Sequence, residues 1–166
     1  MVTNGAGQAD AGGYAPTYTP LGGYATLLGA WTALYGAALT LGVRKGVLPE
    51  RISPGDVVLL GVATHKLTRV LTKDWVTAPL RAPFVRYEES VGGGEVKESA
   101  RGRGLRRAIG DLVTCPWCSG PWVAGALVAG LLGSPRVTRL VAGTFSVVAV
   151  SDFLHHAYGA VKRASD

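Results

Sequence analysis

The stretch that most constrains this chain lies between Asp111 and Arg136, where 24 consecutive residues carry no formal charge. An α-helix rises about 1.5 Å per residue, so this run is long enough to cross the ~30 Å hydrocarbon core of a bilayer. Only helices and closed barrels satisfy every backbone polar group in lipid. The run therefore predicts a membrane helix over residues 112–133, broken or kinked at Pro116 and Pro121 and followed by a tight turn at Gly133-Ser134-Pro135.

Two further apolar runs have the length of a membrane helix. Residues 21–43 contain no charged side chain, and Arg44 and Lys45 follow them directly. Residues 137–161 form the other run, which a second basic pair closes. Both runs predict spanning helices. The first also carries small residues at helical spacing that favour close packing between helices: Gly22, Gly29, Ala33 and Gly36.

Residues 54–73 are ambiguous. Ser53 is a typical N-cap residue and Pro54 suits the first helical position, so a helix is predicted to begin there. Its first half is apolar, whereas its second half carries His65, Lys66 and Arg69. The segment either spans the membrane or lies at its surface as an amphipathic helix. We expect it to span, because residues 57–63 are apolar on all faces. The predicted fold is an all-α integral membrane bundle of about four helices.

The remaining segments are polar or lack a periodic apolar face. Residues 1–20, rich in Gly, Ala, Thr and Tyr, are expected to be flexible, and residues 21–166 to form a single helical membrane domain. Residues 74–111 are predicted to form a long basic loop. By the positive-inside rule this loop and the C-terminus are cytoplasmic in a multi-pass protein of the cell membrane. With four spans the N-terminus lies inside as well, and with three it lies outside.

The net charge of +6 raises the question of a nucleic-acid partner. The basic residues cluster beside apolar spans without interleaved aromatic residues, so nucleic acid is not expected. The predicted partners are the bilayer, with its anionic headgroups, and a second copy or another membrane protein. The residues predicted to bind headgroups are four arginines that no acidic residue dilutes: Arg101, Arg103, Arg106 and Arg107.

The candidate chemistry centres on Cys115-Pro116-Trp117-Cys118, which holds both cysteines of the chain. A thiolate at a helix N-terminus is stabilised, and such pairs exchange disulfides, so a redox pair is one hypothesis. A zinc site completed by His65, His155, His156 or Asp152 is another. The third is that the cysteines pack as small inert side chains. We expect the third, because the predicted topology places both thiols in a reducing cytoplasm and no second pair exists in the chain.

One acidic residue falls deep in the last predicted span. Asp152 needs a counter-charge in lipid, and Arg69 or Lys66 on the second predicted helix can supply it. We predict an ion pair between Arg69 and Asp152 that fixes the bundle near the interface. A proton or substrate relay is the alternative, which the short chain without repeated halves disfavours.

Three segments carry a family resemblance: HKLTRVLTKDWVTAPLRAPF, GEVKESARGRGLRRAIGDLVTCPWCSGPWVAG and TRLVAGTFSVVAVSDFLHH. In this order they resemble a bacterial family of integral membrane proteins, domain of unknown function 1360, over residues 55–158. Some of its members are labelled sporulation proteins. The resemblance implies a multi-span membrane protein and no particular reaction. The sequence therefore predicts a non-enzymatic membrane or envelope component acting through helix packing and a basic cytoplasmic loop. The alternative is a thiol redox or metal-binding protein.

Overall fold

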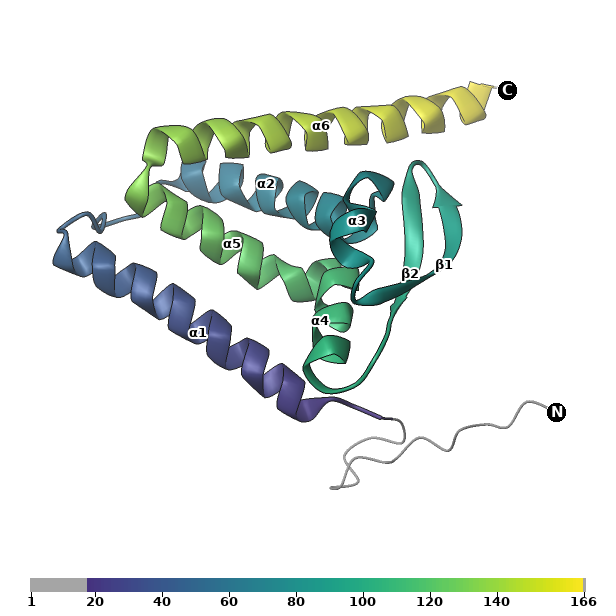
Figure 1. The fold of residues 1–166 in the computed structure, drawn as a ribbon. Coiled ribbons are helices and arrows are strands. Elements are labelled where there is room, and N and C mark those ends of the chain that lie inside the picture. Colours follow the sequence, from purple (N-terminus) through teal and green to yellow (C-terminus); the bar gives the residue numbers. More distant parts are fainter. Residues whose placement is uncertain (1–17, 166) are drawn as a thin grey trace.

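The computed structural model describes residues 18–165, so the predicted flexibility of the N-terminal segment falls largely outside the described residues. The chain is mostly helical (Figure 1). Four long helices lie roughly side by side: α1 (Leu21–Arg44), α2 (Pro54–Lys73), α5 (Pro116–Gly133) and α6 (Pro135–Ser165). Between α2 and α5 lie five shorter elements: η1 (Trp75–Thr77), α3 (Ala78–Arg81), β1 (Val85–Gly92), β2 (Glu95–Ala100) and α4 (Gly104–Thr114).

The long helices alternate in direction (Figure 1). One end of the bundle carries the α1–α2 connection and the turn between α5 and α6. The other end carries residues 74–114, which we call the cap, together with the start of α1 and the C-terminal part of α6. Helix α4 meets α5 at a bend of 85° and so lies across the bundle end.

Helix α2 occupies the centre. The Ser53 hydroxyl accepts the Asp56 N–H at 3.0 Å, which confirms the predicted N-cap. The core joins α2 to its two neighbours through Leu60 and Ala63 of α2, Leu127 of α5 and Ala142 of α6. Small residues at these contacts allow close approach of the helix backbones. The helix for which the sequence leaves a spanning or a surface position open is therefore the one around which α5 and α6 pack.

Helix α1 lies at the periphery and packs mainly against α4 and α5. Its only buried residues are Gly23 and Gly42. The Trp31 indole stacks on Tyr35, with ring centroids 5.3 Å apart, and donates a hydrogen bond to the Pro121 carbonyl at 3.1 Å. Close approach to α5 is possible because Gly125 lacks a side chain: a Cβ there would lie 3.3 Å from the Tyr35 ring.

Two helices, α1 and α6, are long and apolar enough to cross a membrane. The bent pair α4–α5 makes a third candidate if it counts as one span. The predicted helical membrane character is thus confirmed in its coarse form. Four membrane helices stay a prediction, because α2 carries too many charged residues to qualify by composition alone.

The prediction of an all-α fold with a long loop over residues 74–111 is wrong. Strands β1 and β2 form an antiparallel hairpin in which Val85 faces Ala100 and Glu89 faces Lys97. The three glycines at 92–94 close the hairpin with φ angles of +85°, +61° and +80°, a backbone region that glycine adopts without strain. One face of the hairpin buries apolar residues, among them Val96, beside α4.

The helix predicted over residues 112–133 is broken at Pro116, as expected, and its first residues belong to the preceding helix. Residues 112–114 end α4, and α5 begins only at Pro116. Between the two helices Cys115 has an extended backbone, with φ −113° and ψ 108°. The proline ring disfavours the helical conformation at the preceding residue, so the chain turns there instead of continuing as one helix.

Candidate functional site

The two cysteines lie at the turn between α4 and α5. The Cys115 sulfur accepts the Cys118 backbone N–H at 3.2 Å, so Cys115 acts as the N-cap of α5. Both thiols are free, Cys115 half-buried and Cys118 exposed. This geometry gives Cys115 a structural role in starting the helix, and it lends no support to the redox alternative.

The zinc hypothesis is not supported either. Within residues 18–165, no three His, Cys, Asp or Glu side chains come together as a set that would hold a metal ion. His65 instead stacks on Phe153, with ring centroids 6.2 Å apart. The structure does bring His65, Asp152, His155 and His156 to one cavity, but neither cysteine lines it.

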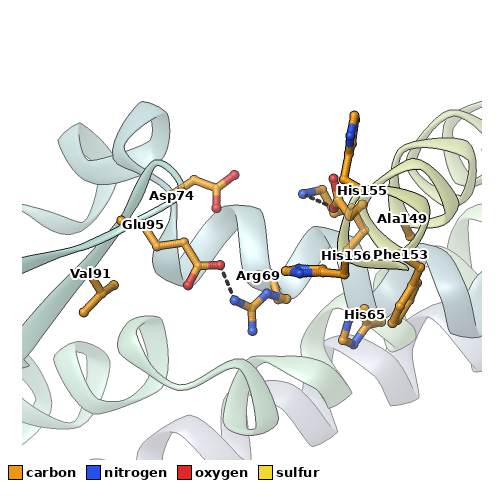
Figure 2. A pocket seen from close by; sticks show the side chains of 13 residues that line it. His65, Arg69, Asp74, Val91, Glu95, Ala149, Phe153, His155 and His156 are labelled. Carbon is orange, nitrogen blue, oxygen red and sulfur yellow. Dashed lines mark hydrogen bonds and ion pairs between the residues drawn. The ribbon is translucent and has the colours of Figure 1, made fainter. Parts of the chain in front are cut away.

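That cavity, of about 640 Å³, lies between α2, α6 and the hairpin turn (Figure 2). Two ion pairs cross it. Lys66 Nζ lies 2.8 Å from Asp152 Oδ2, and Arg69 binds Glu95 of the hairpin. Asp152 thus finds its counter-charge on α2, as expected, but the partner is Lys66 rather than Arg69. Sequence reasoning missed Glu95, because the hairpin that carries it is predicted as a loop.

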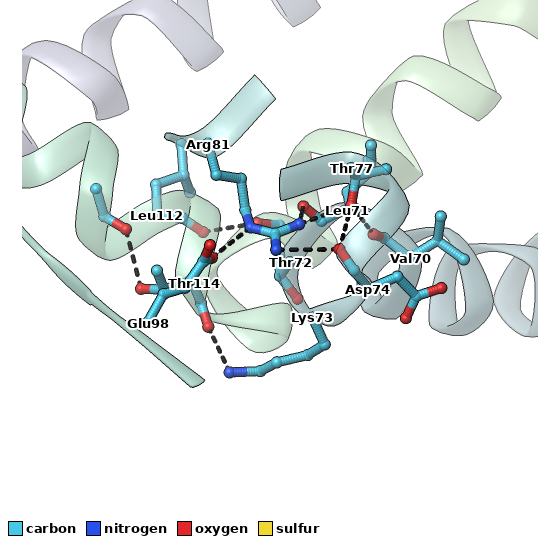
Figure 3. Close-up of polar contacts among 12 residues, drawn as sticks. Val70, Leu71, Thr72, Lys73, Asp74, Thr77, Arg81, Glu98, Leu112 and Thr114 are labelled. Atoms are coloured by element: carbon cyan, nitrogen blue, oxygen red, sulfur yellow. Dashed lines mark hydrogen bonds and ion pairs between the residues drawn. The ribbon is translucent and has the colours of Figure 1, made fainter. Parts of the chain in front are cut away.

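Arg81 holds the cap to the end of α2 (Figure 3). Its side chain is 1% exposed, and its Nε donates to Glu98 Oε2 at 2.6 Å. The guanidinium also donates to the carbonyls of Leu71 at 3.0 Å and Asp74 at 3.1 Å, and to the Thr77 hydroxyl at 2.6 Å. These carbonyls close α2 and have no partner within the helix. Sequence reasoning missed this residue, because Arg81 looks like one basic residue among many.

A second cation, Lys73, binds a carbonyl at the C-terminal end of α4. Lys73 Nζ donates to the Thr114 carbonyl at 2.8 Å, and the Ser119 hydroxyl donates to the Leu112 carbonyl at 2.7 Å (Figure 3). Positive charge at a helix C-terminus is stabilising, since it lies against the negative end of the helix dipole. The cap is therefore anchored to the bundle by polar contacts at helix ends.

The four arginines predicted to bind headgroups divide into two kinds. Arg107 turns inward: its Nη1 donates to the Ala100 carbonyl at 2.7 Å and its Nε lies 3.3 Å from Asp111. Arg101 and Arg106 both donate to the Pro83 carbonyl, and Arg103 is exposed at the N-cap position of α4. Two of the four arginines thus share one acceptor, and Arg103 is exposed on the turn between them in the sequence.

The fold and this site define a class: a small, mostly helical protein, with an ordered polar cap at one end of the bundle and two helices apolar enough to indicate a membrane protein. Residues 59–158 match the model of a family described as protein of unknown function, DUF1360. The match covers more than half of the chain, so the protein belongs to this family. The resemblance read from the sequence is confirmed.

The chain is also similar to a curated relative. Sporulation protein YjcA of Bacillus subtilis (strain 168) is 40% identical over 67 residues, which are 39% of this chain and 57% of the relative. The match therefore spans little more than half of that relative's length. No solved structure matches the chain.

Proposed function

We propose that this protein is a non-enzymatic membrane component that crosses the bilayer four times, packs against other membrane helices through α1, and holds its cap at the cytoplasmic surface. The observation that carries the proposal is that most of the apolar surface of α1 is left uncovered by the rest of the chain. This helix of 24 residues has no charged side chain before Arg44, yet the described residues of the chain bury only Gly23 and Gly42 in it. An apolar helix with a free face needs lipid or another membrane helix beside it.

The free face of α1 is built from small residues. Trp31 and Tyr35 point toward α5, and the opposite face carries Gly22, Gly29 and Gly36. No atom of the described residues lies within 4 Å of a Cβ built at any of these three glycines. They are seven residues apart, which keeps them on one face of a helix, and such faces let two membrane helices approach closely. A second copy of the chain is the first partner to test.

The charges of α2 support a spanning position for this helix. At the end away from the cap, Arg139 of α6 donates to both carboxylate oxygens of Asp56, each at 2.8 Å. At the cap end, Lys66 pairs with Asp152. Charged residues inside membrane bundles face their partners in this way, and the apolar middle of α2 lies against α5 and α6.

The distribution of basic residues supports the orientation. Of the 17 Lys and Arg residues, 12 lie in the second half of α2, the cap and the C-terminal end of α6. The other five lie at the opposite end, in residues 44–51 and 136–139. An excess of Lys and Arg marks the cytoplasmic side of a membrane protein. The relative's name suggests that the envelope of sporulating cells is where this role should be tested first.

The packing is tested by Gly29→Ile together with Gly36→Ile, with Thr32→Ile on the flank of the same helix as the matched control. The wild-type chain and the control should form oligomers in lipid nanodiscs, as measured by mass photometry or cysteine cross-linking. The double variant should be monomeric with unchanged helix content. A monomeric wild-type chain, or an oligomeric double variant, would contradict packing between copies.

The orientation is tested with a membrane-impermeant thiol reagent on intact cells. Cys118, exposed at the cap end, should stay unlabelled until the membrane is opened. A Val47→Cys variant at the other end should be labelled at once. Labelling of Cys118 from outside would overturn the proposed topology.

A further inference from the structure

Two guanidinium groups of the cap converge on one oxygen atom. Arg101 donates to the Pro83 carbonyl through Nε at 3.2 Å and Nη2 at 3.1 Å. Arg106 donates to the same oxygen through Nε at 3.1 Å and Nη2 at 2.7 Å. A carbonyl oxygen carries only a partial negative charge, so it cannot neutralise two cations held this close. This pair of side chains therefore favours an anion beside it.

The protein itself supplies no such anion among the described residues. The acidic side chains nearest in sequence are already engaged, since Glu98 is buried against Arg81 and Asp111 binds Arg107. In residues 18–165, neither Arg101 nor Arg106 forms an ion pair, and Arg103 forms none either. Their Nη1 groups make no hydrogen bond there and remain free to donate.

The backbone holds these side chains in place. Gly102 has a φ of +87° and Gly104 a φ of +55°, so the turn that carries Arg103 depends on glycine at both positions. The stem of Arg106 lies over Gly102, where a Cβ would come within 2.9 Å of the Arg106 Cδ. Helix α4 starts directly after the turn with no acidic residue in its first turn, so its dipole adds to the positive potential.

An apolar groove opens at Gly104 and Leu105, the two residues between Arg103 and Arg106 in the sequence. It has a volume of about 370 Å³ and lies between the start of α1 and the start of α4, where Leu21, Gly22 and Leu105 line it. Figure 1 shows these two helix starts side by side at the cap end of the bundle. Because α1 begins its apolar run here, the arginines lie level with the point where this helix would enter hydrocarbon.

We propose that Arg101, Arg103 and Arg106 bind the phosphate group of an anionic phospholipid, whose glycerol and upper acyl chains occupy the groove between α1 and α4. Planar guanidinium groups suit phosphate oxygens, and two arginines already held together lose little side-chain entropy on binding. A free phosphate ion would satisfy the arginines but leave the apolar groove empty. The proposal rests on the proposed function in one respect only, namely that the cap lies at the membrane surface.

The test uses the full chain in uncharged detergent and three soluble probes: dioctanoyl phosphatidylglycerol, dioctanoyl phosphatidylcholine and inorganic phosphate. Phosphatidylglycerol should bind, as measured by calorimetry and by a rise in Tm, and the other two should bind at least about tenfold more weakly. Changing Arg101, Arg103 and Arg106 together to Gln should weaken phosphatidylglycerol binding by about tenfold or more. The matched control, Arg86→Gln with Lys162→Gln and Arg163→Gln, removes the same charge elsewhere and should bind as the wild type does.

Three results would overturn the proposal. The first is binding of phosphatidylglycerol to the triple variant as tight as to the wild type. The others are a loss of affinity in the control as large as in the triple variant, and binding of inorganic phosphate as tight as that of the lipid. If the triple variant unfolds, Arg103→Gln alone replaces it, because Arg103 makes no hydrogen bond within the described residues that its loss would break. Failure of the proposed function would appear separately, in the oligomeric state and in Cys118 labelling, neither of which the triple variant should change.

Discussion

Helices α1 and α2 are opposites in composition and in position. Helix α1 is apolar throughout, meets the length and hydropathy of a membrane span, and lies at the edge of the bundle. Helix α2 carries a basic second half and does not qualify, yet it buries Leu60, Ala63, Thr68 and Thr72 between its neighbours. In lipid the outer helix must be apolar, whereas the central helix can carry polar groups that its neighbours satisfy. Hydropathy therefore identifies what faces the lipid rather than what lies at the centre.

The two helices also end differently. The carbonyls of Leu41 and Val43 close α1 by accepting backbone N–H groups of the same chain segment, each at 3.0 Å, with Gly46 at a φ of +64°. The end of α2 is bound by the buried Arg81 instead. Loss of a single side chain should consequently affect the second helix far more than the first.

The largest effect is expected from Arg81→Met. This change leaves Glu98 buried without a counter-charge and removes the donors to the last carbonyls of α2, which together should cost about 3–5 kcal/mol of unfolding free energy. Arg44→Met, at the exposed end of α1, should cost less than about 0.5 kcal/mol. Both are measured by titration with a denaturing detergent. Equal losses of unfolding free energy in the two variants would contradict the difference between the helix ends. Adding Glu98→Met to Arg81→Met should restore part of the lost stability, because no buried carboxylate is then left unpaired.

The second test enlarges one alanine in each helix. Ala63 is fully buried at the centre of α2, so Ala63→Leu should destabilise the chain by about 1–3 kcal/mol through overpacking. Ala30 is exposed on α1, and Ala30→Leu should change the unfolding free energy by less than about 0.5 kcal/mol. Thermal unfolding in the same detergent compares the two. A large loss for Ala30→Leu would mean that α1 is packed more tightly than its exposure indicates.

How far the sequence predicts this structure follows from the same contrast. Helices α1 and α6 were predictable, because each contains a long apolar stretch with few charged residues, and hydropathy detects such a stretch directly. The hairpin was not, because every residue of β1 except Val85 is exposed, and only the buried face, with Val85 and Val96, signals a strand. The charged residues that line the cavity between α2 and α6 were predictable as a set, but their pairing into ion pairs was not. Lys66 and Arg69 are three residues apart on one helix, and only the position of Glu95 decides which of them binds Asp152.

The third test concerns the point where α1 joins the cap. A Cβ at Gly23 would lie 2.7 Å from the Ala108 Cβ and 2.8 Å from the Gly104 carbonyl oxygen, whereas a Cβ at Gly22 meets nothing within 4 Å. Gly23→Ala should therefore push α1 away from α4, and Gly22→Ala should not. Hydrogen exchange should rise in α4 and in the first turns of α1 only. If exchange also rises in α2, the two helices are coupled more closely than their contacts suggest.

The smallest effect is expected at an exposed ion pair of the hairpin, between Glu89 and Lys97. The pKa of Glu89 lies below its ordinary value of 4.5, because Lys97 donates a hydrogen bond to it at 2.9 Å. A lowered carboxyl pKa stabilises the folded state above about pH 4.5 and loses that contribution as the pH falls through the lowered value. Hydrogen exchange of the β1 and β2 amides should accordingly increase below pH 4.5, with α1 and α2 unchanged. The increase should be smaller in Lys97→Gln, because Glu89 has no cationic partner in that variant and its protonation breaks no ion pair. An equal increase in that variant would assign the effect to other carboxyl groups of the hairpin.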